Sequence, residues 1–317
     1  MPKAFAMPSV LAVTLPFFAL ILCGWTARAA GVIDAAAPRA LNAFVLYFAL
    51  PALLIRTLAG LPLEALAVPG FLAAWVLVSL AMFALVAVAA RALRQSPKAA
   101  IMQAAAAVHG NVGYLGVSLV LAVLGPSATA AVSMAVVLDF LVIVPLVIAL
   151  TELVGRRDAA PLAALAAAGR SAVANPFVIS ILAGLALAAL GLPPTGMLDE
   201  VLRILGQAAV PAALFAIGAT LHGQPLRAAG PELAAIALLK LVVHPILIVL
   251  VMADLFDVPQ ALIGPAALLA ALPVANNVFV LATRYEARPG VVSASILATT
   301  AMALVTFNLW AGLVIGR

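Results

Sequence analysis

The sequence predicts an all-α membrane protein of ten transmembrane helices, on the evidence of its composition, its uncharged runs and an internal repeat. Of its 317 residues, 67% are hydrophobic, and only 16 are basic and 11 acidic. Globular chains are on average about half apolar and about a quarter charged. Since so few polar residues could not cover a water-facing surface, the composition excludes a soluble enzyme, a disordered tail and a nucleic-acid-binding domain.

The uncharged runs have the length of membrane spans, which need roughly 20 apolar residues each. Residues 4–27 and 65–90 are examples. The run 99–138 is too long for one span, and Gly125-Pro126 divides it because Gly and Pro end helices. The runs lack the alternating pattern of barrel strands. We therefore expect helices, which satisfy the backbone hydrogen bonds of each segment within lipid. The expected spans are 6–26, 37–58, 69–91, 98–123, 127–151, 174–191, 201–222, 231–253, 259–283 and 290–314.

Basic residues are distributed unevenly between the loops. Eleven Lys and Arg residues lie in the odd-numbered loops, against four in the even-numbered loops and termini. Positive charge marks the cytoplasmic side, so we expect both termini to lie on the periplasmic face of a bacterial inner membrane. The apolar stretch of the first segment is long for a cleaved signal, so we expect it to remain as a span. The single cysteine, Cys23, excludes a disulfide framework.

Two stretches of the sequence share the pattern T-L-x-G-x-P-L. They begin at Thr57 and at Thr220, 163 residues apart. A period near 160 residues predicts two halves of five spans, the second inverted in the membrane, as in secondary transporters. Chance similarity between Leu- and Ala-rich helices is the alternative. The expected division is a first repeat over 1–151, a cytoplasmic linker over 152–173 and a second repeat over 174–317.

The fourth span of each half contains residues that interrupt helices. The first reads H-G-N-V-G-Y-L-G-V-S from His109, and the second reads L-P-V-A-N-N from Leu272. Each glycine weakens a helix by about 1 kcal/mol relative to alanine, and a proline removes a backbone donor. Broken helices would present free N–H groups, and asparagine amides beside them, to a carboxylate. Alternatively, the glycines allow close packing and the asparagines join neighbouring helices.

These motifs resemble the auxin efflux carrier family of secondary transporters, which includes the plant PIN proteins and bacterial carriers of malonate and other organic acids. The resemblance covers nearly the whole chain and rests on four stretches: Asn111–Leu119, Asn175-Pro176, Pro211–Gly218 and Leu272–Tyr285. It implies ten helices in the crossover fold of PIN proteins and bile-acid symporters, with discontinuous helices four and nine. It also implies that Asn111 contacts a substrate carboxylate and that the protein forms a dimer.

Two positions depart from the family pattern. Ser118 stands where the family often has proline, and Val278 stands where the plant members have proline. The interruptions in this chain therefore depend on its glycines, its asparagines and Pro273. These departures weigh against auxin recognition of the plant type. The expected substrate is a mono- or dicarboxylate, either auxin-like or malonate-like.

The candidate substrate site combines the two interruptions with polar residues of spans two and seven. Asn42 and Gln207 occupy comparable places in those spans, although they could simply join helices. The candidate substrate-binding residues are Asn111, Gly110, Gly113, Tyr114, Ser118, Pro273, Asn276, Asn277, Asn42 and Gln207.

Three ionisable residues inside spans are candidates for coupling or proton transfer, because buried charge in a membrane is costly and often functional. Asp139 could carry a proton or partner a cation. His109 could titrate or stay neutral, and Lys240 could attract an anion, snorkel or pair with an acid.

The sequence therefore predicts a secondary transporter that moves a small organic anion by alternating access. An anion sensor that does not transport, and a channel, are the alternatives. No residues indicate an enzyme, and no phosphate-binding loop supports an ATP-driven pump. We expect no cofactor, no metal and no nucleic acid partner; lipid, the anion, protons and a second copy of the chain are the expected partners.

Overall fold

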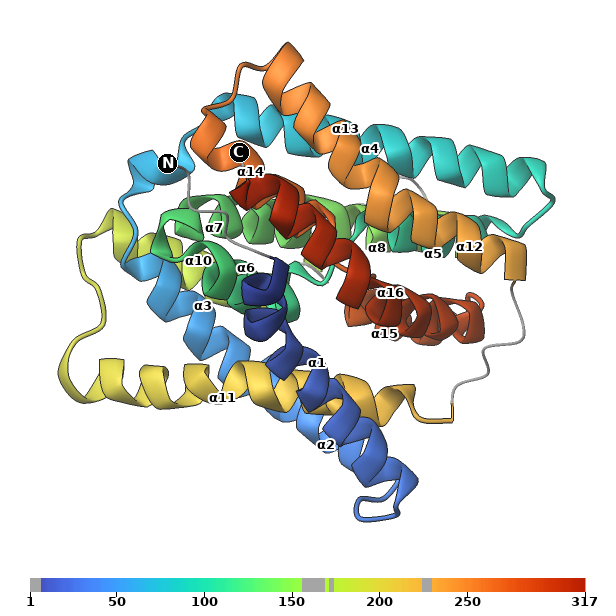
Figure 1. Cartoon of the computed structure of the whole chain (residues 1–317), viewed down its shortest axis with the longest axis horizontal. Helices are drawn as coiled ribbons and strands as arrows, with labels where there is room; N and C mark the ends of the chain where they lie inside the picture. Colours follow the sequence, from blue (N-terminus) through green and yellow to red (C-terminus); the bar gives the residue numbers. More distant parts are fainter. Residues whose placement is uncertain (1–6, 156–168, 171–173, 224–229, 317) are drawn as a thin grey trace.

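The computed structural model describes residues 7–155, 169–170, 174–223 and 230–316 (Figure 1). The structure is 84% helical, and the described residues form no strand. The all-α prediction is thereby confirmed. Most of the expected linker, 152–173, lies outside the described residues.

The helices follow the order of the uncharged runs. In the first half they are α1 (Met7–Ala29), α2 (Ala37–Phe44), α3 (Leu50–Ala59), α4 (Pro69–Ala92), α5 (Pro97–Val108), α6 (Val117–Leu124), α7 (Thr129–Leu138) and α8 (Val144–Gly155). In the second half they are α10 (Pro176–Ala189), α11 (Gly196–Leu221), α12 (Gly230–Leu238), α13 (His244–Leu250), α14 (Gln260–Ala270), α15 (Asn276–Arg284) and α16 (Pro289–Ile315).

Seven helical segments in the described part of the chain are long and apolar enough to cross a membrane. Three of them, Ala37–Ala59, Pro126–Gly155 and Gly230–Leu255, include short π-helical stretches between neighbouring α-helices. Three further apolar helices are shorter than a span: Val112–Leu124, Pro176–Ala189 and Gln260–Ala270. Two of these three belong to the segments in which Gly, Asn and Pro predict an interruption.

Five π-helical stretches widen the described helices by one residue per turn. They are η1 (Val45–Ala49), η3 (Val112–Gly116), η5 (Asp139–Ile143), η7 (Leu239–Val243) and η8 (Val251–Leu255). Such bulges often lie at functional sites. Four candidate residues lie in these stretches: Gly113 and Tyr114 in η3, Asp139 in η5 and Lys240 in η7.

The helices form two groups (Figure 1). In the small bundle, α11 packs against α1, α2 and α3, and α10 packs against α3. In the large bundle, α4 packs against α5 and α13, while α14 packs against α7, α13 and α16. The bundles meet where α1 contacts α16 and α6, and where α11 contacts η3.

Two glycines lie where α1 and α11 pack together in the small bundle. A Cβ atom added to Gly218 of α11 would overlap the carbonyl oxygen of Ile21, and one added to Gly24 of α1 would overlap that of Phe215. Because these neighbours are backbone atoms, no side-chain rotation can relieve the overlap. The two helices therefore approach closely only because both positions are glycine.

The boundary predicted at Gly125-Pro126 is also observed. Gly125 ends α6 with φ +74°, a conformation that glycine adopts without steric cost. Pro126 then begins the short 3-10 turn that leads into α7. Local sequence thus separates two helices that uncharged length alone would merge.

Candidate functional site

Two interrupted segments cross in the large bundle. The α-helical conformation of α5 ends at Val108 and that of α14 ends at Ala270. Between these ends and the helices that follow, the two chains pair through their backbones. The amide nitrogen of Asn111 donates to the carbonyl oxygen of Pro273 at 2.9 Å, and that of Ala275 donates to the carbonyl of His109 at 3.1 Å. Gly110 and Val274 form an antiparallel bridge between them.

Two helices begin at this crossing. Asn111 precedes η3, and its side-chain oxygen accepts a hydrogen bond from the amide of Tyr114 at 3.3 Å. Asn276 is the first residue of α15. The first amides of a helix lack intrahelical partners and carry partial positive charge. The crossing therefore gathers two partly positive helix ends deep in the protein.

A cavity of about 860 Å³ lies between the two bundles beside this crossing. Tyr114, Asn276 and Asn277 line it from the large bundle, and Asn42 lines it from the small bundle. The Oδ1 atom of Asn42 is buried and has no hydrogen-bond partner. The other residues that line the cavity include Arg28, Pro38, Arg39, Tyr47, Val144, Ile148, Asn175, Phe177, Thr220, His222, Phe279 and Arg284.

The described lining of the cavity contains cations and amides but no carboxylate. Arg28 lies in the last turn of α1 and Arg284 in the last turn of α15, while Arg39 lies near the start of α2. None of these three arginines forms an ion pair with a described carboxylate. The cavity is therefore electrostatically suited to an anion.

Asp139 lies in a separate buried cluster. Its carboxylate accepts a hydrogen bond from Trp75 Nε1 at 3.0 Å and lies 3.0 Å from His109 Nδ1. All three side chains are buried. The histidine is itself part of the crossing, since its carbonyl accepts the hydrogen bond from Ala275. Asp139 is thus linked to the crossing through a single side chain.

Lys240 enters the same region from η7. Its ammonium donates to the carbonyl oxygen of Ala270, where α14 ends, at 2.5 Å, and lies 3.1 Å from His244 Nδ1. The side chain is fully buried. A Cβ atom added to Gly110 would lie 3.0 Å from the Lys240 nitrogen, so glycine leaves room for the lysine.

The structure thus divides the candidate residues into groups. Tyr114, Asn276, Asn277 and Asn42 line the cavity, whereas Gly110, Asn111 and Pro273 form the crossing behind it. Asp139 and His109 form the buried cluster, and Lys240 is buried beside Gly110 and bonded to the Ala270 carbonyl.

The remaining candidate residues lie elsewhere. A Cβ atom at Gly113 would contact Phe140 at 3.2 Å, which gives this glycine a packing role. Ser118 is half-buried in α6, and Gln207 is exposed on α11; neither lines the cavity.

Sequence reasoning did not include Arg28, Arg39, Arg284 and His222 in the site. In the sequence they stand at loop boundaries, where basic residues are expected on the cytoplasmic side for topological reasons. Only the packing of α1 and α2 opposite α15 shows that they share a cavity with the asparagines. Among the described residues, no group of three or more His, Cys, Asp or Glu side chains could hold a metal ion.

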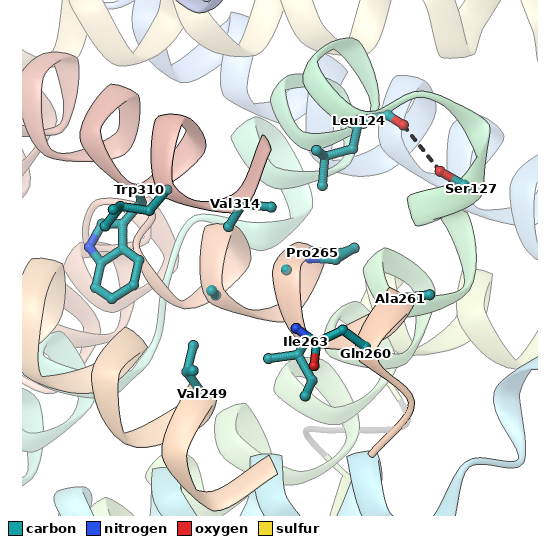
Figure 2. Close-up of a pocket in the computed structure, with 12 residues that line it drawn as sticks. Leu124, Ser127, Val249, Gln260, Ala261, Ile263, Pro265, Trp310 and Val314 are labelled. Carbon is teal, nitrogen blue, oxygen red and sulfur yellow. Dashed lines mark hydrogen bonds between the residues drawn. The ribbon is translucent and has the colours of Figure 1, made fainter. Parts of the chain in front are cut away.

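Figure 2 shows a second, smaller cavity of about 400 Å³, between α6, α13, α14 and α16. Apolar side chains such as Ile263, Val249 and Val314 dominate its lining. Ser127 Oγ is already bonded to the carbonyl of Leu124, at 3.1 Å, and Trp310 Nε1 is bonded to that of Leu241. No cationic side chain lines this cavity within the described residues, so it is poorly suited to an anion.

The apolar helices, their interruptions and the cavity between the bundles are typical of a multi-pass membrane transporter. The model of the family described as "Membrane transport protein" matches residues 9–311. The chain therefore belongs to this family, which is that of the auxin efflux carriers.

A relative from Rhizobium meliloti (strain 1021) has the name "Putative malonate transporter". It is 36% identical over 309 residues, which cover 95% of this chain and 94% of the relative. The similarity therefore includes both interrupted segments.

Proposed function

We propose that this membrane transporter is a secondary carrier that moves a small organic anion, with malonate as the first candidate, by alternating access. The observation that carries the proposal is the position of the cavity beside the crossing. Asn276 and Asn277 line the cavity at the first residues of α15, where the helix is partly positive. Amide donors can bind a carboxylate without the cost of a buried fixed charge.

Asn111 has an indirect part in this proposal. Its side-chain oxygen already accepts a hydrogen bond from the amide of Tyr114, and its backbone amide donates one to the carbonyl of Pro273. The residue is buried and does not line the cavity. We infer that Asn111 positions Tyr114 and the crossing, while Asn276 and Asn277 contact the carboxylate.

The contacts around the crossing support the inverted repeat. Asp139 and Thr299 are 160 residues apart, and each contacts the interrupted segment of its own half. The carboxylate of Asp139 is hydrogen-bonded to His109 Nδ1, and Thr299 Oγ1 accepts a hydrogen bond from the amide of Val274 at 3.2 Å. The small bundle likewise takes the first two of five spans from each half. We therefore propose ten helices in two inverted repeats.

The cavity mouth supports a specific orientation. Arg28, Arg39 and Arg284 border loops whose basic residues mark them as cytoplasmic. We propose that the protein lies in the inner membrane with both termini periplasmic, and that the structure is open to the cytoplasm. In this orientation the cavity is the cytoplasmic half of an alternating pathway.

Flux measurements on the purified protein in proteoliposomes test the proposal. Asn277→Leu is expected to lower malonate counterflow by roughly tenfold or more, because a hydrogen bond to a charged group contributes about 1.5–3 kcal/mol. Gln207→Leu, which removes an exposed amide outside the cavity, is the matched control and should retain flux. Unchanged counterflow in Asn277→Leu would contradict the site. Saturable binding without flux would indicate a sensor, and flux without counterflow a channel.

A further inference from the structure

The cavity has two chemically different ends. Amides of Asn276 and Asn277 lie at the first turn of α15, and the guanidinium of Arg284 lies in its last turn. Arg284 follows Asn276 by eight positions, which corresponds to about 12 Å along a helix. This span exceeds the length of a three-carbon diacid. The amides and the arginine therefore start from backbone positions that are farther apart than one small diacid is long.

The basic end takes residues from both bundles. Arg28 and Arg39 come from α1 and α2 of the small bundle, and Arg284 comes from α15 of the large bundle. His222, at the end of α11, also lines the cavity, and its Nδ1 atom is buried without a hydrogen-bond partner. Arg28 is half-buried, and the other two arginines are exposed enough to reach an entering anion.

No carboxylate in the described part of the chain neutralises the charge at this end. Arg56, Arg203 and Arg288, which lie elsewhere, pair with Asp199, Glu200 and Glu232. Among the described residues, no carboxylate lines the cavity or pairs with its three arginines. Three like charges around one opening attract anions in proportion to the anion's charge, and guanidinium groups bind carboxylates through two parallel hydrogen bonds.

We propose that Arg28, Arg39 and Arg284 form an outer anion subsite that selects dianions over monoanions before the substrate reaches the amides. The subsite rests on the proposed function, because it supplies the anion to the crossing. Its arginines are specificity residues: they set which anion enters, while the amides hold the carboxylate in the inner site. The chemical class of ligand is a small dicarboxylate.

Equilibrium binding to the full-length protein in detergent tests the subsite, and it requires no knowledge of sidedness. The probes are malonate, a dianion above its second ionisation, and monomethyl malonate, a monoanion with the same carbon skeleton. The variant R28Q/R39Q/R284Q is expected to lose about tenfold in affinity for malonate at low salt and less than about twofold for monomethyl malonate. High salt should shrink the difference, because exposed charges are screened.

A charge-matched control removes three basic residues that do not line the cavity. The variant R91Q/R94Q/K98Q changes the net charge equally and should bind both probes as the wild type does. Equal losses for the two probes, or equal losses in the two triple variants, would overturn the subsite and leave the proposed function standing. Wild-type protein that binds neither probe and transports neither would overturn both.

Discussion

The ammonium nitrogen of Lys240 lies 2.5 Å from the carbonyl oxygen of Ala270, the last residue of α14. The final carbonyls of a helix lack intrahelical partners and carry partial negative charge. A buried cation at this point satisfies one of them where the chain leaves the helix to form the crossing. Lys240 therefore stabilises the interruption itself.

Replacing Lys240 should destabilise the protein. Lys240→Met leaves the Ala270 carbonyl without its donor, and an unsatisfied buried acceptor costs about 1–3 kcal/mol. If the Lys240 charge also stabilises the Asp139 carboxylate, the two substitutions are coupled. Thermal unfolding in detergent would report the loss. In the double variant Lys240→Met/Asp139→Asn, the destabilisation should be smaller than the sum of the single effects. Additive effects would mean that the two charges do not interact.

Asp139 should matter for coupling more than for exchange. Its carboxylate is the one acidic group bonded to His109 among the described residues, and His109 is part of the crossing. We predict that Asp139→Asn abolishes accumulation driven by a pH gradient and spares counterflow exchange, because exchange needs no net proton movement. Flux in proteoliposomes with and without the gradient measures both. Wild-type accumulation by this variant would exclude a role in proton coupling.

Two glycines should respond oppositely to alanine. Gly218→Ala places a methyl group against the Ile21 carbonyl and should separate α1 from α11, which lowers the midpoint of thermal unfolding. Gly312 of α16 has no atom within 4 Å of an added Cβ, so Gly312→Ala should be neutral or stabilising by up to about 1 kcal/mol. Equal midpoints for the two variants would contradict the close contact between α1 and α11.

Asn175 lines the cavity, but its side chain is used locally. Its Oδ1 atom accepts a hydrogen bond from the amide of Phe177 at 2.9 Å. Asn175 thereby caps α10, whose first helical residue is Pro176. Asn175→Ala should cost about 1 kcal/mol of stability, and Asn175→Ser should retain both stability and malonate flux because serine also caps helices. A loss of flux in the serine variant without a loss of stability would instead assign Asn175 to substrate binding.

Much of the fold follows from local sequence. Uncharged runs locate the helices, Gly125-Pro126 separates α6 from α7, and the cap at Asn175 is readable from the Asn-Pro pair. The interruptions at Gly110 and Pro273 lie where these residues weaken a helix. Each of these features depends on backbone preferences within a few residues of its position.

The composition of the cavity does not follow in the same way. Asn276 lines it and Gln207 does not, although both are amides within apolar segments. Arg284 lines it although its position in the sequence indicates only a helix end. The difference arises from helix rotation and from the contact between bundles, which connects residues more than 200 positions apart, such as Arg39 and Arg284. The π-helical turns at Asp139 and Lys240 also rotate these side chains in ways that a regular period of 3.6 residues does not predict.

The crossing is held together by main-chain atoms, from Asn111 to Pro273 and from Ala275 to His109. Any amino acid other than proline supplies the same amide donor, so substitutions of the side chains at the crossing leave these two backbone hydrogen bonds in place. Descendants of such a carrier could exchange one cargo for another by altering a few amides or arginines, while the junction that positions them is inherited unchanged.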